Sequence, residues 1–96
     1  MDYEWDEAKR EANLEKHGID FILAPLIHEA DFKLTIPSPR GGETRWVDVA
    51  EIEDEAVVFT LVYTLRHKAI RIVSLRKANR KEHKLYVQAK NQPLHQ

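Results

Sequence analysis

Eight basic side chains between residues 66 and 84 are the part of this sequence best suited to chemistry on an anion. They are Arg66, Lys68, Arg71, Arg76, Lys77, Arg80, Lys81 and Lys84. Arg80 and Lys84 are one helical turn apart, and Arg76 comes just before them at the end of a predicted strand. Guanidinium groups stay charged and grip phosphate oxygens in a bidentate fork. The series therefore predicts one phosphate-binding region built from two neighbouring elements.

A site of this kind could cleave RNA without a metal ion if its side chains fill the necessary roles. A base removes the proton of the 2′-hydroxyl, cations stabilise the crowded phosphorane, and an acid protonates the leaving 5′-oxygen. The arginines that we predict to stabilise the phosphorane are Arg45, Arg66 and Arg76. The side chains that we predict to exchange protons are Glu43, His17 and Tyr86. The residues that we predict to bind RNA by charge are Lys33, Arg71, Lys77, Arg80 and Lys84.

Each candidate for proton transfer also has a purely structural explanation. His17 ends the first predicted helix, where a cation complements the negative end of the helix dipole. Glu43 lies close to Arg45 in the sequence and could simply pair with it. Tyr86 belongs to a predicted helix, in which tyrosine commonly places its ring in the core and its hydroxyl at the surface. The sequence leaves both interpretations open for all of these side chains.

The net charge of −1 conceals a separation of charge along the chain. Residues 1–60 contain 6 Lys or Arg and 15 Asp or Glu, whereas residues 61–96 contain 9 and 1. This separation predicts a basic face for a polyanion, and an acidic region that keeps the chain in solution or meets a basic partner. Two surfaces that neutralise each other within the chain would explain the same pattern.

Motifs for metal ions and cofactors are absent from the sequence. It has no HExxH or EF-hand motif, and its five histidines are scattered at positions 17, 28, 67, 83 and 95. It also has no P-loop, GxGxxG or GxSxG motif. We therefore predict no metal site and no cofactor.

The composition also bears on the compartment. The chain contains no cysteine, which excludes disulfides and suits the cytosol. Its first residues are acidic, unlike a secretory signal. Its longest nearly apolar run, residues 56–63, is far shorter than the ~20 residues that a spanning helix needs. We predict a cytoplasmic protein with no membrane contact.

The elements that must position these side chains begin with two helices. Residues 5–17 repeat apolar positions at helical spacing, with Asp6 near the positive end and Gly18 able to end the helix in a left-handed conformation. Asp20 can cap a second, shorter helix that runs to about residue 29. Pro25 should distort that helix because it lacks a backbone donor.

Strands follow, and then a last helix. The predicted strands are residues 32–36, 44–52, 56–65 and 69–75. Residues 37–42, rich in Pro and Gly, predict a loop, and residues 53–55 an acidic turn. Asn79 and Glu82 have the spacing of a capping box and begin the last helix.

This order predicts an α+β fold in a single domain, residues 1–96, with a core at about 3–88 and a flexible tail at 90–96. Two N-terminal helices and a C-terminal helix would pack on one face of a four-stranded antiparallel sheet. The opposite face would then be open for binding.

Several segments in register resemble the BrnT family of type II toxins. The first is Trp5-Asp6-Glu7-Ala8-Lys9 with Asn13, Lys16-His17-Gly18-Ile19 and Phe21, in the form WDxxKxxxNxxKHGxxF. The others are Glu43-Thr44-Arg45, Val62-Tyr63-Thr64, and Arg71-Ile72-Val73-Ser74-Leu75-Arg76-Lys77-Ala78 with Glu82. Together the resemblance covers about residues 3–88.

The resemblance implies a RelE-like ribonuclease fold and a bacterial cytoplasmic toxin that arrests translation by cutting RNA. It also implies neutralisation by a BrnA-like antitoxin with a ribbon-helix-helix part, through which the complex would contact operator DNA. One alternative is a toxin without catalysis that binds RNA or the antitoxin. Another is a structural partner of a DNA-binding protein, whose basic hairpin meets an acidic antitoxin segment.

Overall fold

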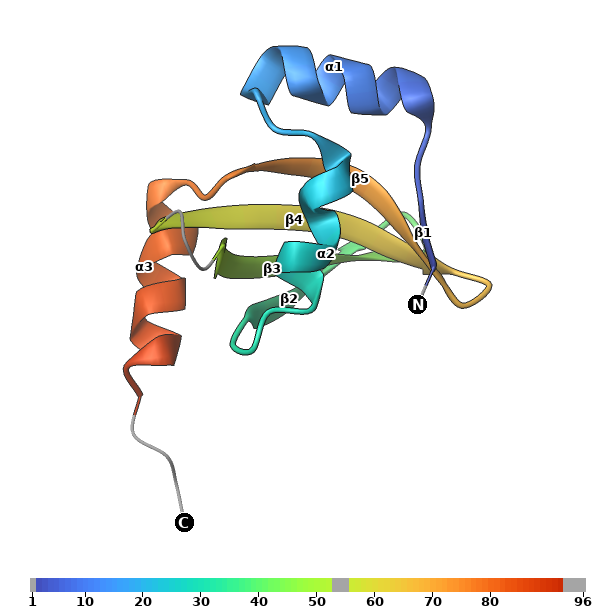
Figure 1. The fold of residues 1–96 in the computed structure, drawn as a ribbon. Helices are drawn as coiled ribbons and strands as arrows, with labels where there is room; N and C mark the ends of the chain where they lie inside the picture. Colours follow the sequence, from blue (N-terminus) through green and yellow to red (C-terminus); the bar gives the residue numbers. More distant parts are fainter. Residues whose placement is uncertain (1, 53–55, 93–96) are drawn as a thin grey trace.

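A computed structural model describes residues 2–52 and 56–92. Five strands form one sheet in the order β1-β5-β4-β3-β2 (Figure 1). The strands are β1 (Asp2–Glu4), β2 (Leu34–Arg40), β3 (Glu43–Ile52), β4 (Val57–Arg66) and β5 (Ala69–Lys77). The helical elements are α1 (Glu7–His17), the 3-10 turn η1 (Phe21–Leu23), α2 (Ala24–His28) and α3 (Arg80–Lys90). Figure 1 shows α2 across the sheet, α1 beside β5, and α3 at one end.

The sheet is mixed, so the prediction of a four-stranded antiparallel sheet is wrong, although the α+β class is confirmed. β1 pairs in parallel with β5, from Asp2 opposite Ala69 to Glu4 opposite Arg71. The other neighbouring strands pair antiparallel. β1 is only 3 residues long, too short to show an alternating pattern, and its partner strand lies near the other end of the chain.

Helix α1 begins and ends as the sequence predicts. The Asp6 carboxylate caps it by accepting hydrogen bonds from the N–H groups of Ala8 and Lys9, at 2.8 and 3.3 Å. Gly18 is left-handed with φ 72°, and its N–H donates to the Leu14 carbonyl at 2.8 Å. Glycine adopts this conformation without a steric penalty.

The second predicted helix is divided, so the expectation of two regular N-terminal helices is only partly right. Asp20 is a cap, as predicted, but it caps η1 by accepting from the N–H of Ile22 at 3.1 Å. α2 then starts at Ala24 with Pro25 in its first turn. A proline is harmless there because first-turn N–H groups have no helical acceptor.

Strand β2 occupies most of the predicted loop at residues 37–42, so that prediction is wrong for residues 37–40. Pro37 and Pro39 pair with β3 in regular antiparallel register. β2 is an edge strand, where a proline without an N–H can be tolerated. Only Gly41 and Gly42 remain outside the two strands, with φ of 48° and 86°.

The last helix starts at the predicted capping box. The Asn79 side chain accepts from the N–H of Glu82 at 2.8 Å, and the Glu82 carboxylate accepts from the N–H of Asn79 at 2.9 Å. The predicted turn at residues 53–55 and residues 93–96 of the predicted tail lie outside the described residues.

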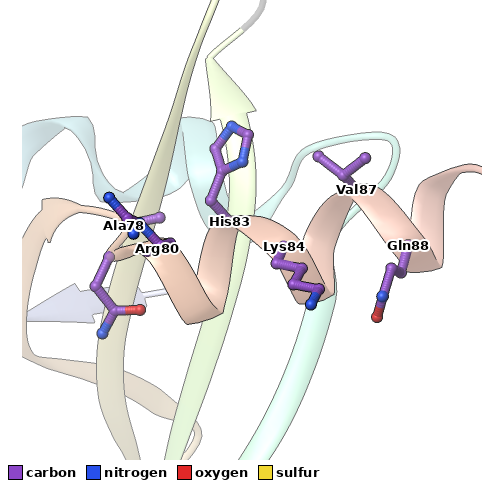
Figure 2. A pocket seen from close by; sticks show the side chains of 7 residues that line it. Ala78, Arg80, His83, Lys84, Val87 and Gln88 are labelled. Carbon is purple, nitrogen blue, oxygen red and sulfur yellow. The ribbon is translucent and has the colours of Figure 1, made fainter.

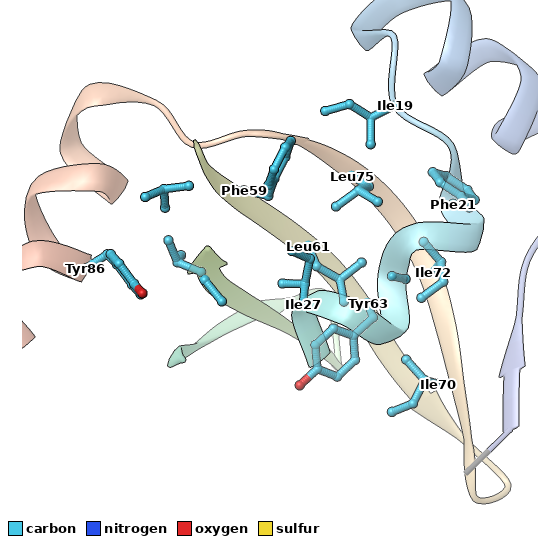
Figure 3. Close-up of a cluster of buried hydrophobic side chains, with 14 residues drawn as sticks. Ile19, Phe21, Ile27, Phe59, Leu61, Tyr63, Ile70, Ile72, Leu75 and Tyr86 are labelled. Carbon is cyan, nitrogen blue, oxygen red and sulfur yellow. The ribbon is translucent and has the colours of Figure 1, made fainter. Parts of the chain in front are cut away.

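The core lies between the sheet and the segment formed by η1 and α2 (Figure 3). Phe21 and Ile27 are fully buried there, together with Leu61, Ile70 and Leu75 of the sheet. Each large apolar side chain removed from water contributes about 1.5 to 3 kcal/mol. This layer therefore fixes which sheet face is covered.

Helix α3 begins on the other side of the sheet, so the prediction that all helices cover one face is wrong. Tyr63 of β4 packs against His28 of α2, with ring centroids 5.0 Å apart. Thr60 is an odd number of residues from Tyr63 and thus points to the opposite face. Its hydroxyl donates to Glu82 in the first turn of α3 at 2.9 Å.

The short strand β1 pairs with only the first part of β5, and Asn13 forms hydrogen bonds with the backbone of β5 beyond it. Its side chain accepts from the Leu75 N–H at 3.2 Å and donates to the Leu75 carbonyl at 2.7 Å. The same amide donates to the Ile19 carbonyl at 3.1 Å. Asn13 is 92% buried, since its exposed fraction is 8%, so it holds α1 against the sheet while satisfying buried backbone groups.

We predict that Asn13→Ala lowers the free energy of unfolding by about 2 to 4 kcal/mol, because it leaves buried donors and acceptors unpaired. Urea unfolding measures this loss. Asn91→Ala, at the exposed end of α3, serves as the control and should change little. A loss below about 0.5 kcal/mol for Asn13→Ala would show that the edge is satisfied in another way.

Candidate functional site

A β-bulge sets the direction of the arginines on β5. The pairing of β4 with β5 shifts between Val62 and Tyr63, which leaves Val73 as an extra residue. Arg71 and Arg76 would face opposite sides on a regular strand, because side chains alternate. The extra residue shifts the alternation of side chains by one position, so Arg71 and Arg76 point to the same face.

The basic face is the sheet surface turned away from α2, and it is defined by Arg45, Arg66, Arg71 and Arg76. On β3, Asp48 faces α2 through a 2.8 Å contact with His28, so Arg45 points the other way. Arg66 is on the face of Thr60 by the same alternation along β4. The basic face thus receives arginines from β3, β4 and β5, which are adjacent strands.

Carboxylates accompany two of the arginines near the hairpin turns. Arg66 lies 3.5 Å from Glu43, and Arg71 lies 3.1 Å from Glu4. The purely structural explanation for Glu43 paired it with Arg45, whereas its partner in the structure is Arg66. Within residues 2–52 and 56–92, no carboxylate is within ion-pair distance of Arg45, which is half-buried. Among the four arginines that define the basic face, Arg45 is therefore the one with the most capacity for an added anion.

The predicted site residues divide between the two ends of the basic face. Glu43, Arg45 and Arg66 lie at the end that carries the β2–β3 and β4–β5 turns, and Arg71 is opposite Thr64, close to Arg66. We call these four charged residues the hairpin cluster. Arg76 lies further along β5, roughly 13 to 16 Å from Arg71 at about 3.3 Å per residue. The sheet therefore brings the four residues of the hairpin cluster together, whereas Arg76 lies outside this cluster.

Arg76 fastens α3 to the sheet. Its guanidinium donates to both oxygens of Glu82, at 2.7 and 2.9 Å. Glu82 also accepts from Thr60 and from the N–H of Asn79. Arg76 and these further donors stabilise the carboxylate and lower the pKa of Glu82 from 4.5 to about 2.

The other predicted proton-transfer residues lie away from the hairpin cluster. The Tyr86 ring is buried, its hydroxyl donates to Glu51 at 3.1 Å, and burial followed by this hydrogen bond raises its pKa. His17 ends α1 one turn after Asn13, whose side chain binds the backbone of Leu75 near the Arg76 end of β5. Neither side chain reaches Glu43.

A polar cluster that sequence reasoning missed surrounds Asp48, which has no exposed surface. Its carboxylate accepts from Thr35 at 2.7 Å, Lys33 at 3.0 Å and Tyr63 at 3.1 Å, and His28 Nδ1 lies at 2.8 Å. The available signal was one acid within the apolar residues 46–50. Lys33, a predicted RNA contact, thus lies on the face covered by α2.

The remaining predicted RNA contacts lie at α3. Arg80 and Lys84 line a cavity of about 560 Å³ along the first turns of this helix, together with His83 (Figure 2). Lys77 is exposed at the end of β5 and pairs with Phe59. These cations extend the positive charge beyond Arg76.

Two structural searches concern metals and membranes. In residues 2–52 and 56–92, no group of three or more His, Asp or Glu side chains is arranged to hold a metal ion. No helix of this described part is long and apolar enough to cross a membrane.

Comparisons with known proteins identify a family and a similar solved structure. The family model described as "Ribonuclease toxin, BrnT, of type II toxin-antitoxin system" matches residues 5–82. The crystal structure of the Brucella abortus ribonuclease toxin BrnT is similar, with a TM-score of 0.61 and 23% sequence identity. The likeness covers 83% of this chain and 99% of that one. None of the curated protein sequences matches this chain.

The lowered pKa of Glu82 predicts how stability depends on pH. Its ion pair with Arg76 stabilises the folded chain above about pH 4.5, and this contribution disappears as the pH falls toward about 2. Glu82→Gln should lower the free energy of unfolding by about 2 kcal/mol at pH 7. It should also make the fall of this free energy between these pH values less steep.

Denaturant unfolding from pH 2 to 7 measures this dependence. Glu4→Gln is the matched control, because its ion pair with Arg71 is more exposed and should contribute little. If both variants show the same profile, the Arg76–Glu82 pair does not hold α3 in place.

Proposed function

The chain belongs to the BrnT family of ribonuclease toxins of type II toxin-antitoxin systems, whose model covers residues 5–82, and we propose that it cleaves RNA at the hairpin cluster without a metal ion. Cleavage of translated RNA would inhibit protein synthesis in the bacterial cytoplasm. A BrnA-like ribbon-helix-helix antitoxin would neutralise the toxin and carry the complex to operator DNA.

The observation that carries the proposal is the position of Arg45 on the basic face. Arg45 has no carboxylate partner among the described residues, while Arg66 lies on the neighbouring strand β4 and Arg71 on β5, the next strand along the sheet. Three guanidinium groups from adjacent strands can bind a phosphodiester and stabilise the extra charge of its phosphorane. Glu43 contributes a carboxylate at the same end.

The proposed reaction is an internal transfer within RNA. The Glu43 carboxylate takes the 2′-hydroxyl proton as the 2′-oxygen attacks phosphorus. The P–O5′ bond then breaks, which gives a 2′,3′-cyclic phosphate, and the leaving 5′-oxygen takes a proton from water. The bound phosphate competes with Glu43 for Arg66, so substrate binding itself frees the carboxylate.

A toxin that binds RNA without cutting it is the alternative. The ion pair between Glu43 and Arg66 favours it, because the carboxylate that would act as the base already has a cationic partner in the free chain. RNA that is bound but not cleaved by the purified protein would identify this function.

We predict that Arg45→Ala lowers the rate of RNA cleavage at least 100-fold, about 3 kcal/mol of transition-state stabilisation. Glu43→Gln should remove cleavage but keep RNA binding. Lys9→Ala, an exposed change on α1, is the control. Cleavage of a labelled RNA is followed on gels, with thermal unfolding to verify the fold. If Arg45→Ala cleaves RNA at the rate of the unchanged chain, the hairpin cluster is not the site of cleavage.

We also predict a salt-dependent affinity for RNA that carries 2′-O-methyl groups and so cannot be cleaved. The logarithm of the binding constant should fall linearly with the logarithm of the salt concentration. Arg71→Ala should make this slope shallower by about 0.7, the value for one phosphate contact on a single strand. Fluorescence anisotropy measures both slopes. Equal slopes would show that Arg71 does not contact phosphate.

A further inference from the structure

An apolar groove of about 780 Å³ lies between α2 and α3, apart from the hairpin cluster. Leu26 and Phe32 line it, with exposed fractions of 52% and 39%. Phe32 meets the ring of Tyr86 at a centroid distance of 5.6 Å, which limits its freedom to turn inward. Large apolar side chains gathered in one exposed groove indicate a surface for association.

The charged side chains around this groove are mostly acidic. Glu29, Asp31 and Glu51 line it, against the single cation Lys90. Lys90 pairs with Glu51 at 2.8 Å. Asp31 is exposed and has no ion-pair partner among residues 2–52 and 56–92. The groove therefore has a negative surplus at its rim.

The apolar lining and the acidic rim together indicate which kind of partner can bind in the groove. A nucleic acid would be repelled by the carboxylates, since its affinity comes largely from cations on the protein. An amphipathic helix can place apolar side chains in such a groove at one-turn spacing. Lysine or arginine beside those anchors would meet the acidic rim.

We infer that the groove is the docking site for a basic amphipathic helix of the antitoxin. The inference rests on membership of a toxin-antitoxin family and not on RNA cleavage. Glu51 and Arg45 lie six residues apart on β3, roughly 20 Å at about 3.3 Å per residue. A helix that occupies only the groove therefore leaves the hairpin cluster uncovered, and neutralisation needs a second antitoxin segment or a larger assembly.

The test uses the antitoxin from the same operon, with affinity measured by calorimetry in the absence of RNA. Leu26→Lys and Asp31→Lys should each weaken binding at least tenfold. Ile22→Lys is the matched control, because Ile22 is 59% exposed and lies outside both the groove and the hairpin cluster. It should bind within twofold of the unchanged chain. Thermal unfolding verifies each variant, and Asp31→Lys carries the test if Leu26→Lys fails to fold.

Two results would overturn the inference. If the groove variants bind the antitoxin normally while Arg71→Glu loses binding, the antitoxin lies on the basic face. If sedimentation shows that the groove variants change only self-association, the groove belongs to a second copy of the chain. Loss of RNA cleavage has no bearing on either result, so the two proposals fail separately.

Discussion

The extra residue at Val73 is the constraint on which the candidate site depends. It shifts the phase of β5 after Arg71, so that Arg76 keeps the same face while Ile72 and Leu75 both remain buried. Without it, one arginine would enter the face that η1 and α2 cover, at the cost of burying a charge. The basic face is therefore a consequence of how the core is packed.

The two ends of the basic face have different tasks. At one end, Arg76 and Glu82 use their charges to join α3 to the sheet, and both oxygens of the carboxylate are engaged. At the other end, the ion pairs are more exposed and Arg45 has no acidic partner among the described residues. Charge that is already neutralised in a well-ordered pair supports structure, whereas exposed and unpaired charge is available to a ligand.

Local signals predicted the parts of the fold that they control. Asp6, Gly18 and Asn79 act as helix caps because their side chains or φ angles suit those positions. Long-range pairing could not be predicted in this way. β1 is too short to show a period, and the prolines of β2 indicate a loop unless the strand is known to be at an edge. The separation of Arg76 from Arg45 likewise follows from strand length and register, which composition does not reveal.

The central claim is that RNA binds at the hairpin cluster rather than along α3. NMR spectra of the labelled chain, titrated with RNA that carries 2′-O-methyl groups, test it most directly. We predict the largest shift changes at Arg45, Arg66 and Arg71, with little change at Lys84. Changes concentrated at Arg80 and Lys84, with Arg45 unaffected, would contradict it.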